Sequence, residues 1–389
     1  MFLEEETLNK LHLNSPPGGW FPALQFLSWC ITESNLPWAN LFFSPHLKRI
    51  QIYTESLWDD DTVSPAIFPT LASIISTLPT SSLEVMWVDD GYPTMVWAHL
   101  KDSLSSLILR CGPSFTDHNS PVPLSNAALH HLIHLPHLRT WRIHGPPPTY
   151  PASSLPLVFP PLKELTLGKD AACGWFSLLR RLEDGTSTTQ GVTPLSKAKE
   201  LLTILNVEDM FVIKIDPCFA STIQYFRNLV NLNVDVDCPD EDEGGECIFK
   251  LNDDNVTELA MVLTQLEFLL LGRACSKNTC LTTVACLLTI SVHCSKLKEV
   301  SIHFNTTNIV DDFRNILEDP RFQQLRSLPR CPLTFLDAYD MPLGLRGSDF
   351  ETVAKGMVNV FPSLEGFQTF TEGWDELSGK IPDFQESSE

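Results

Sequence analysis

The chain has 389 residues, 43% of them hydrophobic, and its 48 acidic and 27 basic residues give a formal net charge of −21. This balance argues against nucleic acid as a partner, because phosphate contacts need clustered lysine and arginine, and the basic runs, such as Arg180-Arg181, are no longer than two residues. The sequence lacks an apolar run long enough for a membrane span (about 18 residues), and its acidic residues 1–6 do not resemble a secretory signal.

One pattern dominates the chain: the hexad Leu-x-x-apolar-x-apolar, whose positions we call places 1 to 6. It recurs twelve times, opening at Leu24, Leu47, Leu83, Leu104, Leu138, Leu162, Leu202, Leu229, Leu266, Leu297, Leu333 and Leu364. Three apolar places alone match by chance at roughly 8% of positions in a chain of this composition. Two further features make the pattern specific. Leucine opens every hexad, and proline stands two residues ahead of it in five, at Pro22, Pro45, Pro136, Pro160 and Pro362.

The hexads predict an α/β fold, a leucine-rich-repeat solenoid. Their starts lie 21 to 40 residues apart, which leaves room for a helix or loop after each strand. A strand presenting places 4 and 6 to one side, with place 1 packed beside them, cannot bury that side alone, so neighbouring repeats must stack. We expect a horseshoe with parallel strands on the concave face and helices and loops on the convex face. Each proline should end the helix before it.

We expect one solenoid over residues 1–372, with about twelve irregular repeats and a possible extra first strand at 8–13. Residues 373–389 are polar and acidic, which predicts a disordered tail. A terminal repeat needs a polar cap. The chain opens almost directly with repeat sequence, which suggests a missing upstream segment.

Helical periodicity appears between the hexads. Apolar residues spaced at i, i+3, i+4 and i+7 predict helices at Leu71-Ile74-Ile75-Leu78, Leu129-Leu132-Ile133 capped by Ser125, Val256-Leu259-Ala260-Leu263, Val310-Phe313-Ile316-Leu317 closed by Pro320, and Phe350-Val353-Ala354-Met357. Asp253 or Asp254 is the expected N-cap of the third. The segments 146–148, 185–191 and 235–246 have loop composition.

Three clusters could hold a metal, but each has a plainer interpretation. His130, His131, His134 and His137 fit the exposed side of a helix, and Cys275, Cys280, Cys286 and Cys294 with His293 follow no zinc-binding spacing. The acids 240–243 lack the order of a calcium loop and fit a solvated loop, or else a docking strip for a basic partner. We therefore expect no metal. The eleven cysteines, without a secretory signal, indicate reduced thiols in a cytoplasmic or nuclear protein.

Catalytic signatures are missing from the sequence. It contains no nucleophile elbow, phosphate-binding glycine loop, His-Glu-x-x-His or dinucleotide fingerprint. We expect a protein that is not an enzyme and that needs no cofactor. Repeat geometry instead predicts a protein-binding surface made by places 2, 3 and 5 of the hexads. The candidate residues are Lys163, Glu164, Thr166, Lys298, Glu299 and Ser301.

The chain resembles the fungal F-box/leucine-rich-repeat proteins of mushroom-forming species. The resemblance lies in residues 14–22 (NSPPGGWFP), 270–273 (LLGR), 275–279 (CSKNT), 303–308 (HFNTTN) and 319–322 (DPRF). It implies a substrate receptor, in which an N-terminal F-box binds the adaptor of a cullin-RING ubiquitin ligase and the repeats hold a target protein.

This sequence departs from that family pattern in two ways. No F-box helices precede the repeats, so adaptor binding requires an F-box upstream, and a free-standing scaffold or inhibitor is the alternative. The family pattern has an Asn or Cys beyond place 6, with two residues between. Among the twelve hexads, Asn305 alone fills that position. The usual side-chain ladder therefore cannot run through the repeats.

Overall fold

The computed structural model divides into two compact units, Met1–Ala198 and Lys199–Glu389. The structure describes residues 5–16, 20–31, 35–54, 67–77, 82–87, 104–111, 131–132, 134–143, 161–168, 200–208, 217–235, 249–272, 281–318, 320, 324, 327–339, 343–369 and 373–385.

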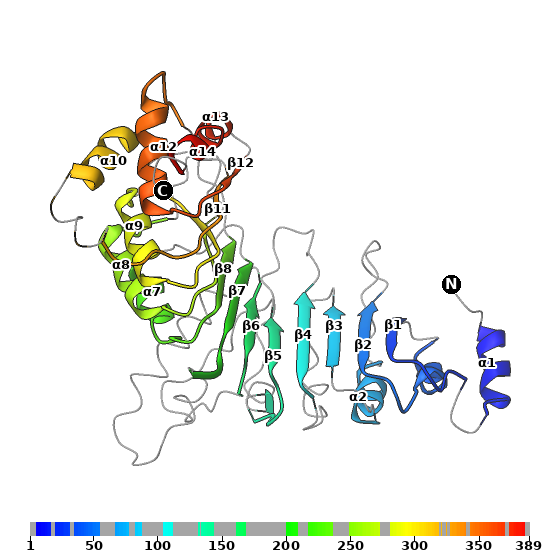
Figure 1. Cartoon of the computed structure of the whole chain (residues 1–389). Helices are drawn as coiled ribbons and strands as arrows, with labels where there is room; N and C mark the ends of the chain where they lie inside the picture. The colour runs from blue at the N-terminus through cyan, green and yellow to red at the C-terminus, as the bar shows by residue number, and fades with distance from the viewer. Residues whose placement is uncertain are drawn as a thin grey trace, which may run out of the picture. The chain divides into compact units, whose positions relative to one another are not determined.

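The first unit is built on six parallel strands in sequence order, which lie side by side in Figure 1. Its elements are α1 (Glu5–Leu13), β1 (Phe26–Ile31), the 3-10 helix η1 (Leu36–Phe42), β2 (Arg49–Thr54), α2 (Ile67–Thr77), β3 (Ser82–Trp87), β4 (Ser106–Cys111), β5 (Thr140–Ile143) and β6 (Glu164–Leu167).

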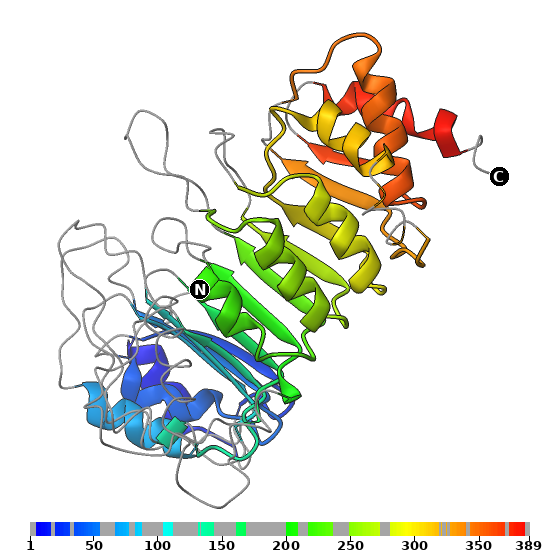
Figure 2. The same cartoon turned by 90° about the vertical axis from the view of Figure 1, so that its left-hand side faces the viewer.

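The second unit alternates parallel strands with helices, and the helices cover one side of the strands (Figure 2). Its elements are β7 (Ile204–Glu208), α7 (Pro217–Ile223), β8 (Asn231–Asp235), α8 (Asp253–Val262), β9 (Phe268–Leu271), α9 (Ala285–His293), β10 (Glu299–Ile302), α10 (Ile309–Glu318), β11 (Phe335–Tyr339), α12 (Asp349–Val360), β12 (Gly366–Thr369), α13 (Trp374–Ser378) and α14 (Ile381–Gln385).

The hexad leucines lie in the core, apart from the partly exposed Leu24. Leu138, Leu229, Leu297 and Leu364, all at place 1, are fully buried. Neighbouring repeats are joined by a recurring hydrogen-bond pattern at place 2. The N–H groups of Lys298 and Glu299, for example, both donate to the Glu267 carbonyl (2.9 and 3.3 Å). Each strand is therefore aligned on the one before it, and places 1, 4 and 6 of successive repeats stack.

The proline ahead of the hexad takes the second position of a turn. The N–H of Leu47 donates to the Ser44 carbonyl (3.1 Å), and that of Leu364 donates to the Phe361 carbonyl (3.0 Å), which places Pro45 and Pro362 just after the first turn residue. Proline's fixed φ suits this position. Pro362 also follows the end of α12 at Val360 as expected, whereas Pro160 lies outside the described residues.

The third hexad is out of register with the others. Leu83 pairs with Ile50 of β2 and with Leu107 of β4, which both hold place 4. Leu83 is therefore the place 4 residue, and the assignment of this hexad's opening to Leu83 was wrong by three residues. The other eleven hexads match the pairing of their strands where a pairing is described, except at the end of β11, where a register shift pairs Tyr339 instead of Ala338 with Thr369.

The predicted helices are confirmed at α2, α8, α10 and α12, and Val256, Leu259, Ala260, Phe313 and Val353 of these helices are buried. The N-cap of α8 is Asn252, not an aspartate. Asn255 N–H donates to Asn252 Oδ1 (2.9 Å), and Asn252 N–H donates to Asn255 Oδ1 (3.3 Å). Of the helix expected near 129–133, the described residues include His131 and Leu132, and Leu132 is buried.

Two expectations about the ends of the chain were wrong. Residues 8–13, proposed as an edge strand, belong to helix α1, whose buried Leu8 and exposed Lys10–Glu6 pair (2.6 Å) follow helical spacing. Residues 374–385, expected to be disordered, form α13 and α14.

The two C-terminal helices pack on the last repeat of the second unit. The ring of fully buried Trp374 lies 4.9 Å from that of Phe367, and Gln385 Nε2 donates to the Leu364 carbonyl (2.6 Å). A side chain at Gly366 of β12 would meet Ser378 Oγ at 3.0 Å. These helices therefore cover the terminal repeat as a solenoid cap does.

The α/β class and the parallel strands are confirmed, and the arrangement is consistent with leucine-rich repeats. The horseshoe and the single continuous solenoid remain predictions. Asn305 makes a local contact, since its Oδ1 accepts from Thr307 N–H (2.9 Å). The repeats join there through the backbone, as Asn305 N–H donates to the Thr282 carbonyl (2.8 Å).

Candidate functional site

Each unit has a strand face, which we define as places 2, 3 and 5 of its hexads together with the residue after place 6, called place 7. In a strand, places 3, 5 and 7 point away from places 4 and 6. The described side chains at places 4 and 6 are buried in the core, apart from partly exposed Leu27 and Phe367. In the second unit the helices lie on the core side (Figure 2). The strand face is thus the side of the repeats that the helices do not cover.

The candidate residues on β6 only partly fit a binding role. Lys163 is exposed and Glu164 is partly exposed. Thr166 is 3% exposed, so its proposal as a binding residue was wrong. A short side chain at place 5, inside a sheet and between longer neighbours such as Arg142 on β5, cannot reach the surface.

Of the candidate residues on and next to β10, two are exposed and one is buried. Lys298 Nζ and Glu267 Oε2 form an exposed ion pair (2.6 Å), and the hydrogen bond from Lys298 holds the pKa of Glu267 below its usual range. Glu299 is exposed. Ser301 is 6% exposed, between Leu270 and Asp337 on the adjacent strands, so it too was wrongly proposed for binding.

The structure adds residues that the sequence reasoning missed. At place 3, pairing aligns Phe268, Glu299 and Phe335 across β9, β10 and β11. Phe335 is 48% exposed and Phe268 is partly exposed. A large aromatic residue at an outward place was the available signal, because the core needs apolar side chains at places 1, 4 and 6 alone.

The two strand faces differ in charge. Among side chains that the structure describes, the face of the first unit carries Lys48, Arg49, Arg139, Arg142, Lys163 and one carboxylate, Glu164. The face of the second unit carries Glu208, Asp235, Glu267, Glu299, Asp337, Glu365 and one ammonium group, Lys298.

The metal-binding alternatives gain no support from geometry. Cys286 and Cys294 are buried and are not in disulfides, and Cys294 Sγ lies 3.7 Å from the Leu263 carbonyl oxygen. Over the part of the chain that the structure describes, no three His, Cys, Asp or Glu side chains gather as metal ligands would. Cys275, Cys280, His130 and the acids 240–243 lie outside the described residues.

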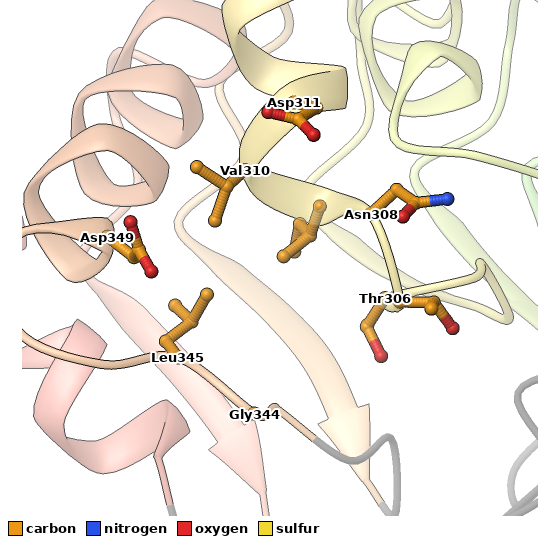
Figure 3. A pocket seen from close by; sticks show the side chains of 9 residues that line it. Thr306, Asn308, Val310, Asp311, Gly344, Leu345 and Asp349 are labelled. Atoms are coloured by element: carbon orange, nitrogen blue, oxygen red, sulfur yellow. The ribbon is translucent and has the colours of Figure 1, made fainter.

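A cavity of about 410 Å³ lies at the start of α10 and α12 (Figure 3). Val310, Leu345 and Asp349 point into it, and Asp311, which also lines it, is paired with Arg314 (2.7 Å). Carboxylates at two helix N-termini repel an anion, which would otherwise be the natural ligand there. The lining residues therefore do not specify a ligand.

The sequence matches no protein-family model, and no curated protein matches it. Among solved structures, the chain is similar to one in the crystal structure of the Rad7 and Elc1 complex in yeast. The two are 14% identical over 94% of this chain and 81% of that chain, with a TM-score of 0.38. That likeness is too weak to carry an argument. No helix among the described residues is long and apolar enough to cross a membrane.

Proposed function

We propose that the chain is a protein-interaction module that binds its target through the strand face of the second unit and has no catalytic role. One observation carries the proposal. The row at place 3 exposes Phe335 and partly exposes Ile204 and Phe268 on the side free of helices. Aromatic side chains that lose water on binding dominate the energy of protein interfaces.

The finer part of the proposal is that the bound protein is a substrate of an F-box-type ubiquitin ligase, in the cytoplasm or nucleus. The resemblance in residues 14–22 and in the block from 270 to 322 supports this part. The adaptor of the ligase would be bound by an F-box, which the repeats do not supply.

The test is affinity capture from an extract of the source organism with the full chain and with Phe335→Asp. A charge at this position should abolish capture of the target, because it cannot be buried in an apolar contact without a large cost. Met261→Asp is the matched control, since Met261 is 57% exposed on α8, on the helix side. Equal capture by wild type and Phe335→Asp would contradict the proposal. Recovery of a cullin adaptor favours the ligase receptor, and its absence favours a scaffold or inhibitor.

A further inference from the structure

The exposed carboxylate of Glu299 lies between two aromatic side chains. Phe268 and Phe335 are its partners in register on the two adjacent strands, and adjacent strands are separated by about 4.8 Å. No ion pair or hydrogen bond of the Glu299 side chain occurs among the described residues. An acid flanked by two rings is suited to a planar cation, which can stack on a ring and donate hydrogen bonds to the carboxylate.

In the first unit an arginine at place 3 lies over a phenylalanine ring at place 3 of the adjacent strand. Phe26 of β1 and Arg49 of β2 are also place 3 residues, paired in register. The Cζ atom of Arg49 lies 5.4 Å from the centroid of the Phe26 ring. In the second unit the corresponding row of described side chains has the rings of Phe268 and Phe335 but no lysine or arginine.

The negative charge of the strand face of the second unit also favours a cationic ligand. Its six carboxylates outnumber the single ammonium of Lys298, which is already paired with Glu267. The overall charge of −21 does not account for this excess, because the strand face of the first unit in the same chain is mainly basic. Complementary charge steers association and sets which partner is accepted.

We propose that the strand face of the second unit binds a basic, extended segment of a partner protein, with an arginine side chain seated on Glu299 between Phe268 and Phe335. The inference rests on the proposed function and names the chemistry of the partner. Apolar residues of the segment would cover Phe335.

The test is a fluorescence anisotropy titration of the full chain with a labelled peptide of three Arg-Leu-Ser repeats. Peptides with lysine or glutamate in place of arginine are the matched probes. The arginine peptide should bind tightest, and the glutamate peptide should bind at least about tenfold more weakly. Glu299→Gln and Phe335→Ser should each weaken the arginine peptide by about threefold to tenfold.

Two control variants on α8, Glu258→Gln and Met261→Ser, lie on the helix side and should leave the affinity unchanged. Equal affinity for the arginine and glutamate peptides would overturn the inference. So would an unchanged affinity in Glu299→Gln, or an equal loss in Glu258→Gln, which would indicate non-specific attraction to an acidic chain. Failure here is separable from failure of the proposed function, because capture of a target that depends on Phe335 but not on Glu299 would sustain the latter alone.

Discussion

Gly356 of α12 packs directly against the ring of Phe313 of α10. A Cβ atom built on Gly356 would lie 2.3 Å from Cδ1 of that ring, closer than atoms can approach. Phe313 is fully buried, so its ring has little room to move. The absence of a side chain at 356 is what lets these two helices approach each other.

We therefore expect Gly356→Ala to destabilise the protein, although alanine ordinarily favours a helix over glycine. Overpacking a core costs about 1–3 kcal/mol, and urea unfolding followed by circular dichroism measures it. Combining Gly356→Ala with Phe313→Leu should cost less than the sum of the two single changes, because the smaller side chain makes room. Strict additivity, or a stabilised Gly356→Ala, would contradict this packing.

Burial of the hexad leucines predicts a contrast between two leucines of the second unit. Leu297 is fully buried at place 1, whereas Leu281 is 62% exposed. Leu297→Ala should cost about 2–5 kcal/mol of unfolding free energy, as large core truncations do. Leu281→Ala is the matched control and should change it by less than about 0.5 kcal/mol. Similar losses in the two variants would show that the hexads do not form the core.

Asp253 predicts a pH dependence of stability. Its carboxylate accepts hydrogen bonds from the N–H and the hydroxyl of Thr283 (both 2.7 Å), but burial raises its pKa above 3.8. The folded state then holds the proton more tightly than the unfolded state. The stability contributed by this group is full below pH 3.8 and is lost as the pH rises through the folded-state pKa.

Asp253→Asn should remove this loss of stability at higher pH, because the amide cannot ionise. The amide can still form hydrogen bonds with the N–H and the hydroxyl of Thr283. The unfolding free energy of the variant should therefore increase relative to that of wild type from about pH 4 to about pH 7. Urea titrations at each pH measure this difference. A relative stability that falls over this range would contradict the predicted sign.

Two buried thiols should be unreactive. Burial raises the pKa of Cys294 to about 12 and that of Cys331 to about 11, so the thiolate that attacks an alkylating reagent is scarce near pH 8. N-ethylmaleimide labelling mapped by mass spectrometry should spare both residues in the folded protein and modify them in urea. Partly exposed Cys30 is the internal control and should react in the folded state. Labelling of Cys294 as fast as Cys30 would refute the buried environment.

The repeat pattern was a good guide to the strands because it describes what a stacked core needs. It could not place the third hexad, since Leu83, Met86 and Val88 satisfy the spacing, whereas counting back from Leu83 at place 4 gives Thr80 at place 1 instead of a leucine. Only pairing of Leu83 with Ile50 decides between the two registers. Composition misled at the C-terminus, where three buried side chains, Trp374, Leu377 and Ile381, lie among acidic and polar residues.

The candidate site was predicted less well, because exposure depends on neighbours that are distant in sequence. Places 2, 3 and 5 stay the predicted binding places, yet Ser301 is buried by longer side chains on adjacent strands, while Phe335 is exposed at another outward place. The N-cap of α8 is Asn252, whereas the carboxylate of Asp253 accepts a hydrogen bond from Thr283, 30 residues further along the chain. Such tertiary contacts leave no local signature in the sequence.

The central claim, that the strand face of the second unit binds a protein, is tested most directly by site-specific photo-crosslinking. p-Benzoylphenylalanine is placed in the full chain at Phe335, or at Met261 on the helix side, and irradiated in an extract of the source organism. We expect a discrete protein adduct from position 335, identified by mass spectrometry, and none from position 261. Adducts from position 261 alone, or equal adducts from the two positions, would contradict it.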